Sequence, residues 1–265
     1  MDTKTILLDV GGTFIKCSDG REIPVDSAGR RDSIAESLRS AVGDAHEVAV
    51  AIPGPFDYEK GIFLMKHKFA AVYGECFADI IGGNREYRFI HDVNAMLLGE
   101  MASGAGKGYK RVALVTLGTG LGFAMSIDGA LLKNEMGSPA VPIWNLPYRD
   151  GILEDYASKR GFLRGYEGIS VKELAETAFA GDTAAIARFA EVGEILSKAL
   201  APILAEYGIE CLLFGGQISR SFDLFGPCLR SGLAKVSALR HIGPVSDVSR
   251  ATFNGLKTLI EVSQS

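Results

Sequence analysis

The sequence predicts an α/β protein of two domains, and three observations lead to this. A buried strand, a glycine turn and a second apolar stretch occur at 5–16, and a strand, glycine turn and strand occur again at 111–127. Between and after these hairpins, strand-like runs alternate with stretches of helical periodicity. The chain of 265 residues also exceeds the usual size of one domain. We place the boundary at the glycine-rich segment 104–108, which gives domains 1–105 and 106–265.

The boundary has an alternative, because 104–108 could be an ordinary loop within a single domain. Whether the final helix packs back on the first domain is also left open by the sequence. Boundaries between elements are harder to predict from one sequence than the elements themselves.

Composition and charge exclude several classes of protein. Hydrophobic residues make up 47% of the chain, which is enough for a large core. The formal net charge is −4 with no basic block, so we expect no nucleic-acid partner. No stretch approaches the roughly 20 apolar residues of a membrane helix, and no signal peptide is visible. The four scattered cysteines are typical of reduced thiols in a cytoplasmic protein: Cys17, Cys76, Cys211 and Cys228.

The first hairpin carries the strongest local signal. The apolar strand 5–10 contains Asp9 and runs into Gly11 and Gly12, which are followed by Thr13. Exposed backbone N–H groups at such a turn can bind an anion, and Asp9 could hold a cation through water. A plain hairpin with a Gly-Gly turn is the alternative for this stretch alone.

The rest of the first domain alternates strands and helices. Strand 47–52 ends at a rigid corner, Pro53-Gly54-Pro55, and strand 87–91 stops at Asp92. Shorter strands are expected at 21–25 and 62–65, and helices at 32–42, 74–81 and 93–103.

The second domain opens as the first one does. Strand 111–116 is followed by a turn with Gly118, Thr119 and Gly120, and strand 123–127 comes next. The spacing matches neither a Walker loop nor the dinucleotide-binding glycine pattern, so a tight β-turn is the alternative. Helices are expected at 151–160, 171–180, 183–207 and 249–262, and strands at 209–214 and 240–243. The pair Gly215-Gly216 follows the first of these strands, where α/β sheets bind nucleotides.

Seven short segments of the chain, taken in sequence order, form a pattern. They read DVGGT at 9–13, PGP at 53–55, HDVNA at 91–95, LGTGLG at 117–122, NEMG at 134–137, GILEDYAS at 151–158 and FGG at 214–216. In this order they resemble the ROK sugar kinases (repressor, open reading frame, kinase) of the actin-like ATPase superfamily. The resemblance covers nearly the whole chain.

The resemblance implies a fold, an activity and cofactors. The fold would be two actin-like (ribonuclease H-like) α/β domains with a nucleotide and sugar cleft between them. The activity would be phosphorylation of a hexose-like sugar hydroxyl by ATP with Mg²⁺, in a cytoplasmic homodimer of carbohydrate metabolism. Asp92 would be the catalytic base, although the residues alone favour a helix N-cap at this position.

The resemblance also assigns the other site residues. Asp9 would hold Mg²⁺ through water. The nucleotide and its phosphates would bind to Asp9, Gly11, Gly12, Thr13, Gly118, Thr119, Gly120, Gly215 and Gly216. The sugar would bind to Pro53, Gly54, His91, Asn94, Glu135 and Glu154. Without the resemblance, Glu135 and Glu154 could be solvated surface acids.

Three departures from the family pattern put the sugar in doubt. Ser138 stands where the family usually has a histidine, and His91 stands where it has an asparagine. The segment 139–150 has no cysteine and no histidine, so we expect no zinc site. The altered hydrogen-bonding groups favour weak activity on glucose and better activity on another sugar. The basic segment 66–69 could contact a hydroxyl or a phosphate, but we favour a solvated turn.

The sequence leaves two other functions open. The chain could be a non-catalytic sugar or nucleotide sensor of the same family without a DNA-binding domain, because only four residues precede the first strand. It could also be another actin-like ATPase, such as an acid kinase. The presence of both Asp9 and Asp92 favours the sugar kinase.

Overall fold

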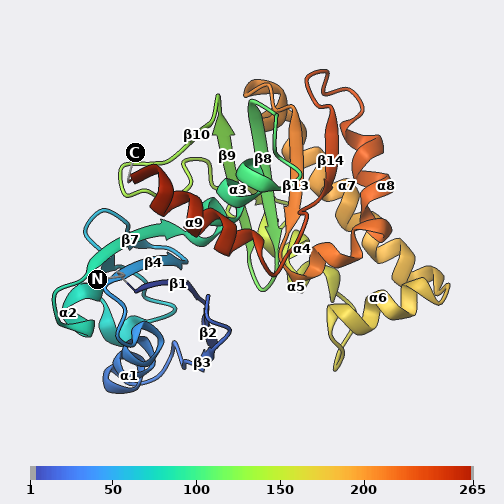
Figure 1. The fold of residues 1–265 in the computed structure, drawn as a ribbon. Coiled ribbons are helices and arrows are strands. Elements are labelled where there is room, and N and C mark those ends of the chain that lie inside the picture. Colours follow the sequence, from blue (N-terminus) through green and yellow to red (C-terminus); the bar gives the residue numbers. More distant parts are fainter. Residues whose placement is uncertain (1–3, 264–265) are drawn as a thin grey trace. The chain divides into compact units, whose positions relative to one another are not determined.

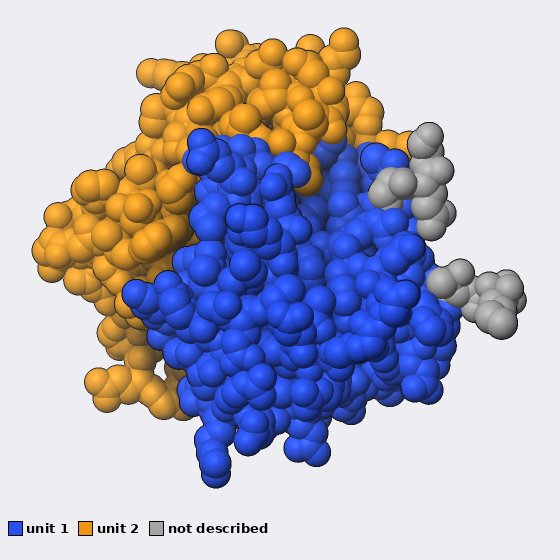
Figure 2. Space-filling view, turned by 90° about the vertical axis from the view of Figure 1, so that its left-hand side faces the viewer, with its two compact units in different colours: residues 1–103, 133–140, 249–265 blue, residues 104–132, 141–248 orange. Residues whose placement is uncertain are grey.

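The computed structural model describes residues 4–263, so residues 1–3 and 264–265 of the expected domains lie outside the described part. The chain divides into two compact units (Figure 2). Unit 1 contains residues up to 103, the segment 133–140 and the residues from 249 onward, and unit 2 contains 104–132 and 141–248. The domain limits expected from the sequence stay a prediction.

Unit 1 is built on a five-stranded sheet with the order β3-β2-β1-β4-β7 (Figure 1). Its strands are β1 (Thr5–Val10), β2 (Phe14–Cys17), β3 (Glu22–Pro24), β4 (Glu47–Ile52) and β7 (Glu86–His91). The first three strands form an antiparallel meander, and β4 and β7 run parallel to β1. β4 is buried along its whole length, as the central strand of a covered sheet should be.

The helices of unit 1 follow the expected apolar periodicity. They are α1 (Arg31–Val42), α2 (Phe77–Ile81), α3 (Asp92–Ser103) and α9 (Ala251–Ser263), with a short 3₁₀ turn at Ala70–Val72. α1 buries Ile34, Ala35 and Leu38 on one face. A small hairpin, β5 (Phe56–Asp57) and β6 (Ile62–Phe63), adds Phe56 and Phe63 to the core of this unit.

Unit 2 repeats the same sheet pattern, with the order β10-β9-β8-β13-β14. Its strands are β8 (Arg111–Leu117), β9 (Leu121–Ile127), β10 (Ala130–Leu131), β13 (Cys211–Gly215) and β14 (His241–Pro244). Here too a meander is followed by two strands parallel to its first strand. The duplicated strand–glycine–strand signal therefore marks two sheets of one topology, and the expected α/β fold class is confirmed.

The helices of unit 2 are α4 (Leu153–Ala157), α5 (Lys159–Phe162), α6 (Val171–Phe179), α7 (Thr183–Glu206) and α8 (Phe222–Leu233). A short hairpin, β11 (Pro147–Tyr148) with β12 (Gly151–Ile152), precedes α4, and a 3₁₀ segment at Gln217–Ser221 precedes α8. α7 is capped at its N-terminus by Asp182, whose carboxylate accepts the Ala185 N–H at 2.8 Å. It packs against α6 and α8.

One expected helix is divided. The sequence predicts a single helix over 151–160, but its first two residues form β12, and α4 and α5 are separated at Ser158. Ser158 has an extended backbone, with φ −104° and ψ −171°, and its hydroxyl accepts the Arg160 N–H. A serine that caps a new helix competes with continuation of the old one, which explains the break.

Helices α3 and α9 lie side by side in unit 1 through a pair of glycines (Figure 1). A Cβ at Gly255 would collide with the Ala95 carbonyl oxygen, and a Cβ at Gly99 would collide with that of Ala251. Only glycine permits this approach of the two backbones. The contact fixes α3, the helix whose first residue is Asp92. Within residues 4–263, no helix combines the length and apolarity needed to span a bilayer.

Candidate active site

Three segments expected in the site leave the same edge of the unit 1 sheet. β1, β4 and β7 are parallel neighbours, with Asp9 opposite Ala51 and Ile52 opposite His91. Asp9 near the end of β1, Pro53 after β4 and Asp92 after β7 therefore lie at the carboxyl edge, where open α/β sheets bind ligands.

The turn after β1 is held by its own backbone. The Gly11 N–H donates to the Phe14 carbonyl at 3.0 Å, and the Gly12 carbonyl accepts the Ser27 N–H at 3.2 Å. A Cβ at Gly11 would lie 2.9 Å from the Phe14 oxygen, so a larger residue does not fit there without a shift. Thr13 is exposed, with its carbonyl accepting the Val25 N–H.

Asp92 is half-buried at the start of α3 and is bound on two sides. Its Oδ1 lies 2.8 Å from His91 Nδ1 and accepts the Val93 N–H at 2.8 Å. Burial acts to raise the pKa of this carboxyl, but the charge and hydrogen bond of His91, the Val93 N–H and the charge of Lys68 together lower it below its usual 3.8. Asp92 is therefore ionised at neutral pH and able to accept a proton.

Asp9 behaves in the opposite way. Burial, assisted by the charge of Asp92 and opposed by Lys16, raises the pKa of Asp9 from 3.8 to about 6. Two nearby carboxyls with pKa values moved apart are typical of sites where each has a separate task. A divalent cation beside Asp9 would stabilise its charged form.

The ring of His91 is packed as well as hydrogen-bonded. Its centroid lies 5.8 Å from that of Tyr58, whose hydroxyl donates to the Ile52 carbonyl at 2.8 Å. A Cβ at Gly54 would lie 3.5 Å from both His91 Nε2 and the Tyr58 hydroxyl. Gly54 thus lies beside the His91 ring, while a shared role in sugar binding stays a prediction. Sequence reasoning missed Tyr58, because a tyrosine in a short hairpin carries no distinctive signal.

Asn94 is fully buried and connects α3 to the segment that carries Glu135. Its Nδ2 donates to the Gly137 carbonyl at 3.2 Å, and its Oδ1 has no hydrogen-bond partner among the described residues. Glu135 itself is exposed. The Asn134 side chain accepts N–H groups from Met136 and Ser138, each at 3.0 Å, and so closes the turn. The direct sugar contact expected for Asn94 stays a prediction.

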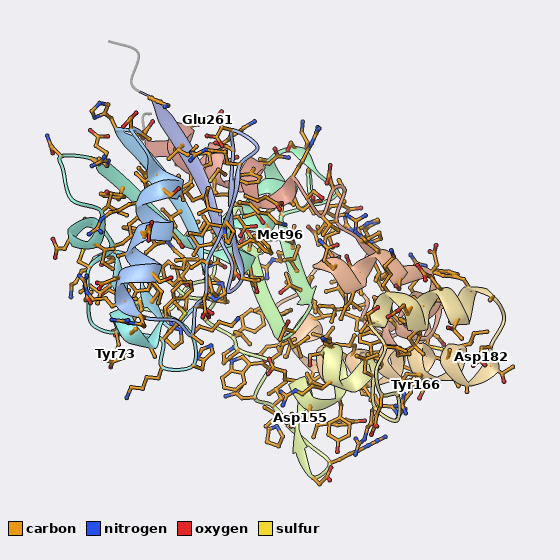
Figure 3. All side chains as sticks on the ribbon, turned by 90° about the horizontal axis from the view of Figure 1, so that it is seen from below. Tyr73, Met96, Asp155, Tyr166, Asp182 and Glu261 are labelled. Carbon is orange, nitrogen blue, oxygen red and sulfur yellow. The ribbon has the colours of Figure 1, made fainter. Side chains whose placement is uncertain are left out.

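In unit 2, the glycine turn after β8 is tied to Glu154. Glu154 Oε2 accepts the Leu121 N–H at 2.9 Å, and its Oε1 pairs with Arg160 at 3.0 Å. A Cβ at Gly120 would lie 2.9 Å from Oε2. Glu154 therefore contacts the turn of Gly118, Thr119 and Gly120 directly and keeps 22% of its side-chain surface exposed. Sequence reasoning missed Arg160, which also pairs with Asp155, labelled in Figure 3.

The second glycine pair of unit 2 lies beside the same turn. β13 is the parallel neighbour of β8, with Gly215 opposite Thr116. Gly216 has a φ of +80°, and a Cβ there would collide with the Leu117 carbonyl. Glycine is therefore required by both the backbone conformation and the close approach.

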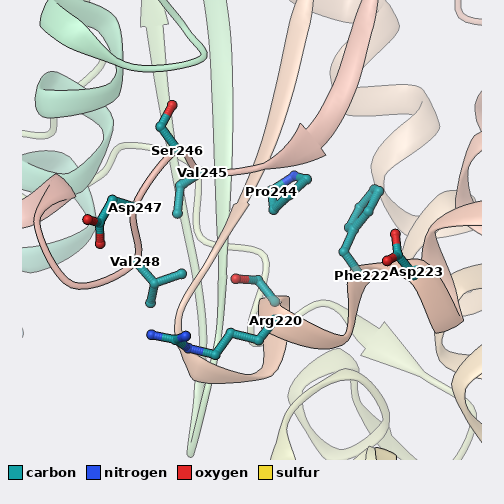
Figure 4. A pocket seen from close by; sticks show the side chains of 9 residues that line it. Arg220, Phe222, Asp223, Pro244, Val245, Ser246, Asp247 and Val248 are labelled. Atoms are coloured by element: carbon teal, nitrogen blue, oxygen red, sulfur yellow. The ribbon is translucent and has the colours of Figure 1, made fainter. Parts of the chain in front are cut away.

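A pocket of about 380 Å³ opens next to this pair (Figure 4). It lies after the carboxyl ends of β13 and β14, and the residues that line it are Ser219, Arg220, Phe222, Asp223, Pro244, Val245, Ser246, Asp247 and Val248. Sequence reasoning missed these residues. The signal that could have found them is the succession of two parallel strands, whose ends meet at one edge.

Among residues 4–263, no group of three or more His, Cys, Asp and Glu side chains is placed to hold a metal ion. Mg²⁺ keeps most of its waters in proteins and needs only one or two carboxylates together with phosphates, so Asp9 fits it.

Comparison with known proteins decides the family. The ROK family model matches residues 28–255. The chain belongs to the ROK family. It is 30% identical to a glucokinase of Thermotoga maritima, over 84% of this chain and 85% of that protein.

Solved structures agree on the fold. A ROK glucokinase from Streptomyces griseus, in complex with glucose and AMPPNP, aligns with a TM-score of 0.79 at 23% identity and covers 96% of this chain and 98% of its own. A ROK hexokinase from Thermus thermophilus aligns with a TM-score of 0.74 at 20% identity, covering 98% of this chain and 99% of its own. The family and the fold expected from the seven segments are confirmed.

Proposed function

We propose that this ROK protein is an ATP-dependent sugar kinase that phosphorylates a hydroxyl group of a hexose-like sugar. The observation that carries the proposal is Asp92, kept ionised by His91 and the Val93 N–H at the sheet edge beside Asp9. Family membership and the 30% identity to a glucokinase support the same class of enzyme.

The proposed reaction is a direct transfer. The sugar hydroxyl oxygen forms a bond to the γ-phosphorus as the bond from this phosphorus to the β–γ bridging oxygen breaks, and ADP leaves with that electron pair. The hydroxyl proton passes to Asp92. Most of the catalytic effect in such transfers comes from positioning and charge neutralisation. Mg²⁺, held by Asp9 through water, would neutralise phosphate charge when bound.

Each unit contributes a set of binding residues to this proposal. In unit 1, the backbone at Gly11 and Gly12 and the Thr13 hydroxyl are proposed to bind phosphate oxygens. In unit 2, Gly118, Thr119 and Gly120 have the same proposed role, and Gly215 and Gly216 bind the adenosine side. We extend the adenosine site to the neighbouring pocket, which has both charged and apolar lining residues.

The sugar is proposed to bind to Pro53, Gly54, His91, Asn94, Glu135 and Glu154. The structure adds a constraint, because the Nδ1 of His91 is already close to Asp92 and only its Nε2 edge faces Gly54. A homodimer and a cytoplasmic location stay expectations from the family resemblance.

A coupled assay of ADP release with MgATP and a panel of sugars tests the proposal. The panel is glucose, mannose, fructose, N-acetylmannosamine and N-acetylglucosamine. We expect sugar-dependent ADP release with at least one of them, and weaker activity on glucose than on another. Tight sugar or nucleotide binding without turnover would instead support the non-catalytic sensor.

A further inference from the structure

The lysine at position 68 comes from the basic segment 66–69, for which the sequence favours a solvated turn. Lys66 fits that description, since it is exposed and its ammonium lies 5.3 Å from the centroid of the Tyr73 ring. Lys68 does not fit it. Lys68 is half-buried, and its Cε and Cδ would lie 3.6 and 3.7 Å from a Cβ built on Gly12. The side chain of Lys68 therefore lies along the glycine turn.

The backbone fixes Lys68 in this place. The next residue, Phe69, is fully buried and has a left-handed φ of +53°, which is uncommon for a bulky residue. The Phe69 N–H donates to the Ser27 carbonyl, and the Ser27 N–H donates to the Gly12 carbonyl at 3.2 Å. Two hydrogen bonds thus connect the lysine-bearing segment to the turn. Unfavourable backbone conformations that persist in this way often serve a site.

The positive charge of Lys68 acts on Asp92, where it is the smallest of the effects that lower the pKa of this carboxyl. Within residues 4–263, Lys68 takes part in no ion pair with a carboxylate. A cation that lies along a glycine turn proposed to bind phosphate, and that is not neutralised by an ion pair, is suited to an anionic ligand.

We propose that Lys68 binds the γ-phosphoryl group of ATP and stabilises the negative charge of this group during its transfer to the sugar. This inference rests on the proposed function and deepens it, because it assigns a residue to the phosphoryl group itself. As the bond to the bridging oxygen breaks, negative charge on the transferred group and on ADP must be balanced, and an ammonium group at the Gly12 turn supplies that balance.

Nucleotide binding tests the proposal without a sugar. Mg·AMPPNP and Mg·ADP are titrated by calorimetry into wild type, Lys68→Met and Lys66→Met, the matched exposed control. We expect Lys68→Met to weaken AMPPNP binding by about tenfold and ADP binding by less than about twofold. We expect Lys66→Met to change neither. Lys68→Arg keeps the charge and should retain most of the preference for AMPPNP. Lys68→Gln replaces Lys68→Met if the latter fails to fold.

The outcomes separate the two proposals. If wild type binds neither nucleotide, the kinase assignment falls, and the role of Lys68 falls with it. If wild type binds both but Lys68→Met weakens both equally or neither, only the role of Lys68 is overturned. A loss of AMPPNP affinity with ADP affinity kept supports it, because a merely structural role would move both.

Discussion

His91 Nδ1 lies 2.8 Å from Asp92 Oδ1, so the side chain at a position expected to contact the sugar also contacts the proposed base. The same Oδ1 accepts the Val93 N–H at 2.8 Å. Two donors on one carboxylate oxygen orient the group and keep it ionised. This contact favours a role of His91 in orienting Asp92, which the sequence pattern did not indicate.

Replacement of His91 by phenylalanine should separate this function from packing. The ring that packs near Tyr58 is kept, but the donor to Asp92 is lost, so the pKa of Asp92 rises. Because the base must be ionised, the acid limb of the kcat/KM profile should move to higher pH. We expect kcat to fall by roughly tenfold. An unchanged acid limb in the pH profile would show that His91 does not tune Asp92.

Replacement of Asp9 by asparagine should stabilise the metal-free protein while it impairs turnover. The folded-state pKa of Asp9, about 6, lies above its usual 3.8, so folding favours the protonated form. Stability from this group is therefore fully present below about pH 4 and is lost as pH rises through 6. In urea unfolding with EDTA, Asp9→Asn should be more stable than wild type above about pH 4, with a gain that grows up to about pH 6 and then stays level, because Asp9 is then ionised in both the folded and the unfolded state. A variant that is less stable at pH 8 would contradict this.

The glycine contact between α3 and α9 should tolerate no side chain. Gly255→Val places methyl groups against the Ala95 carbonyl, and overpacking of this kind costs about 1–3 kcal/mol or more. We expect a clear drop in Tm and, because α3 begins at Asp92, a lower kcat. Lys257→Ala, at an exposed position of the same helix, is the control and should leave both nearly unchanged. Equal melting temperatures for the two variants would refute the tight contact.

A larger side chain in the pocket beside Gly216 should weaken the binding of ATP. Val248 lines this pocket and is half-buried, so Val248→Trp adds bulk to the pocket without removing a hydrogen bond. We expect a higher KM for ATP with the KM for sugar unchanged. Fluorescence titration with ADP checks the binding step alone, and an unaltered ADP affinity would place the adenosine elsewhere.

Local sequence patterns predicted much of this fold. The apolar spacing of 93–103 and 183–207 corresponds to α3 and α7, and the two glycine hairpins correspond to two sheets of equal topology. The ordered segments also led to Asp9 and Asp92. These features depend on residues close together in the chain, where periodicity and turn chemistry act directly.

What the sequence could not supply depends on distant contacts. Lys68 meets Gly12 only because Phe69 and Ser27 connect their segments. Glu154 meets the turn at Leu121 across 33 positions of sequence, and Gly99 meets α9 through backbone proximity alone. The helix expected over 151–160 shows a local limit as well, because the capping hydrogen bond of Ser158 outweighs an apolar pattern.

Transfer of the γ-phosphoryl group to a sugar, compared between wild type and Asp92→Asn, tests the central claim most directly. With radiolabelled MgATP and the sugar panel, wild type should form a sugar phosphate. Asp92→Asn should bind ATP normally and lose about 10²-fold or more in kcat. Sugar phosphate formed by Asp92→Asn at the wild-type rate would contradict the role of Asp92, and no sugar phosphate from wild type with any sugar of the panel would contradict the assigned activity.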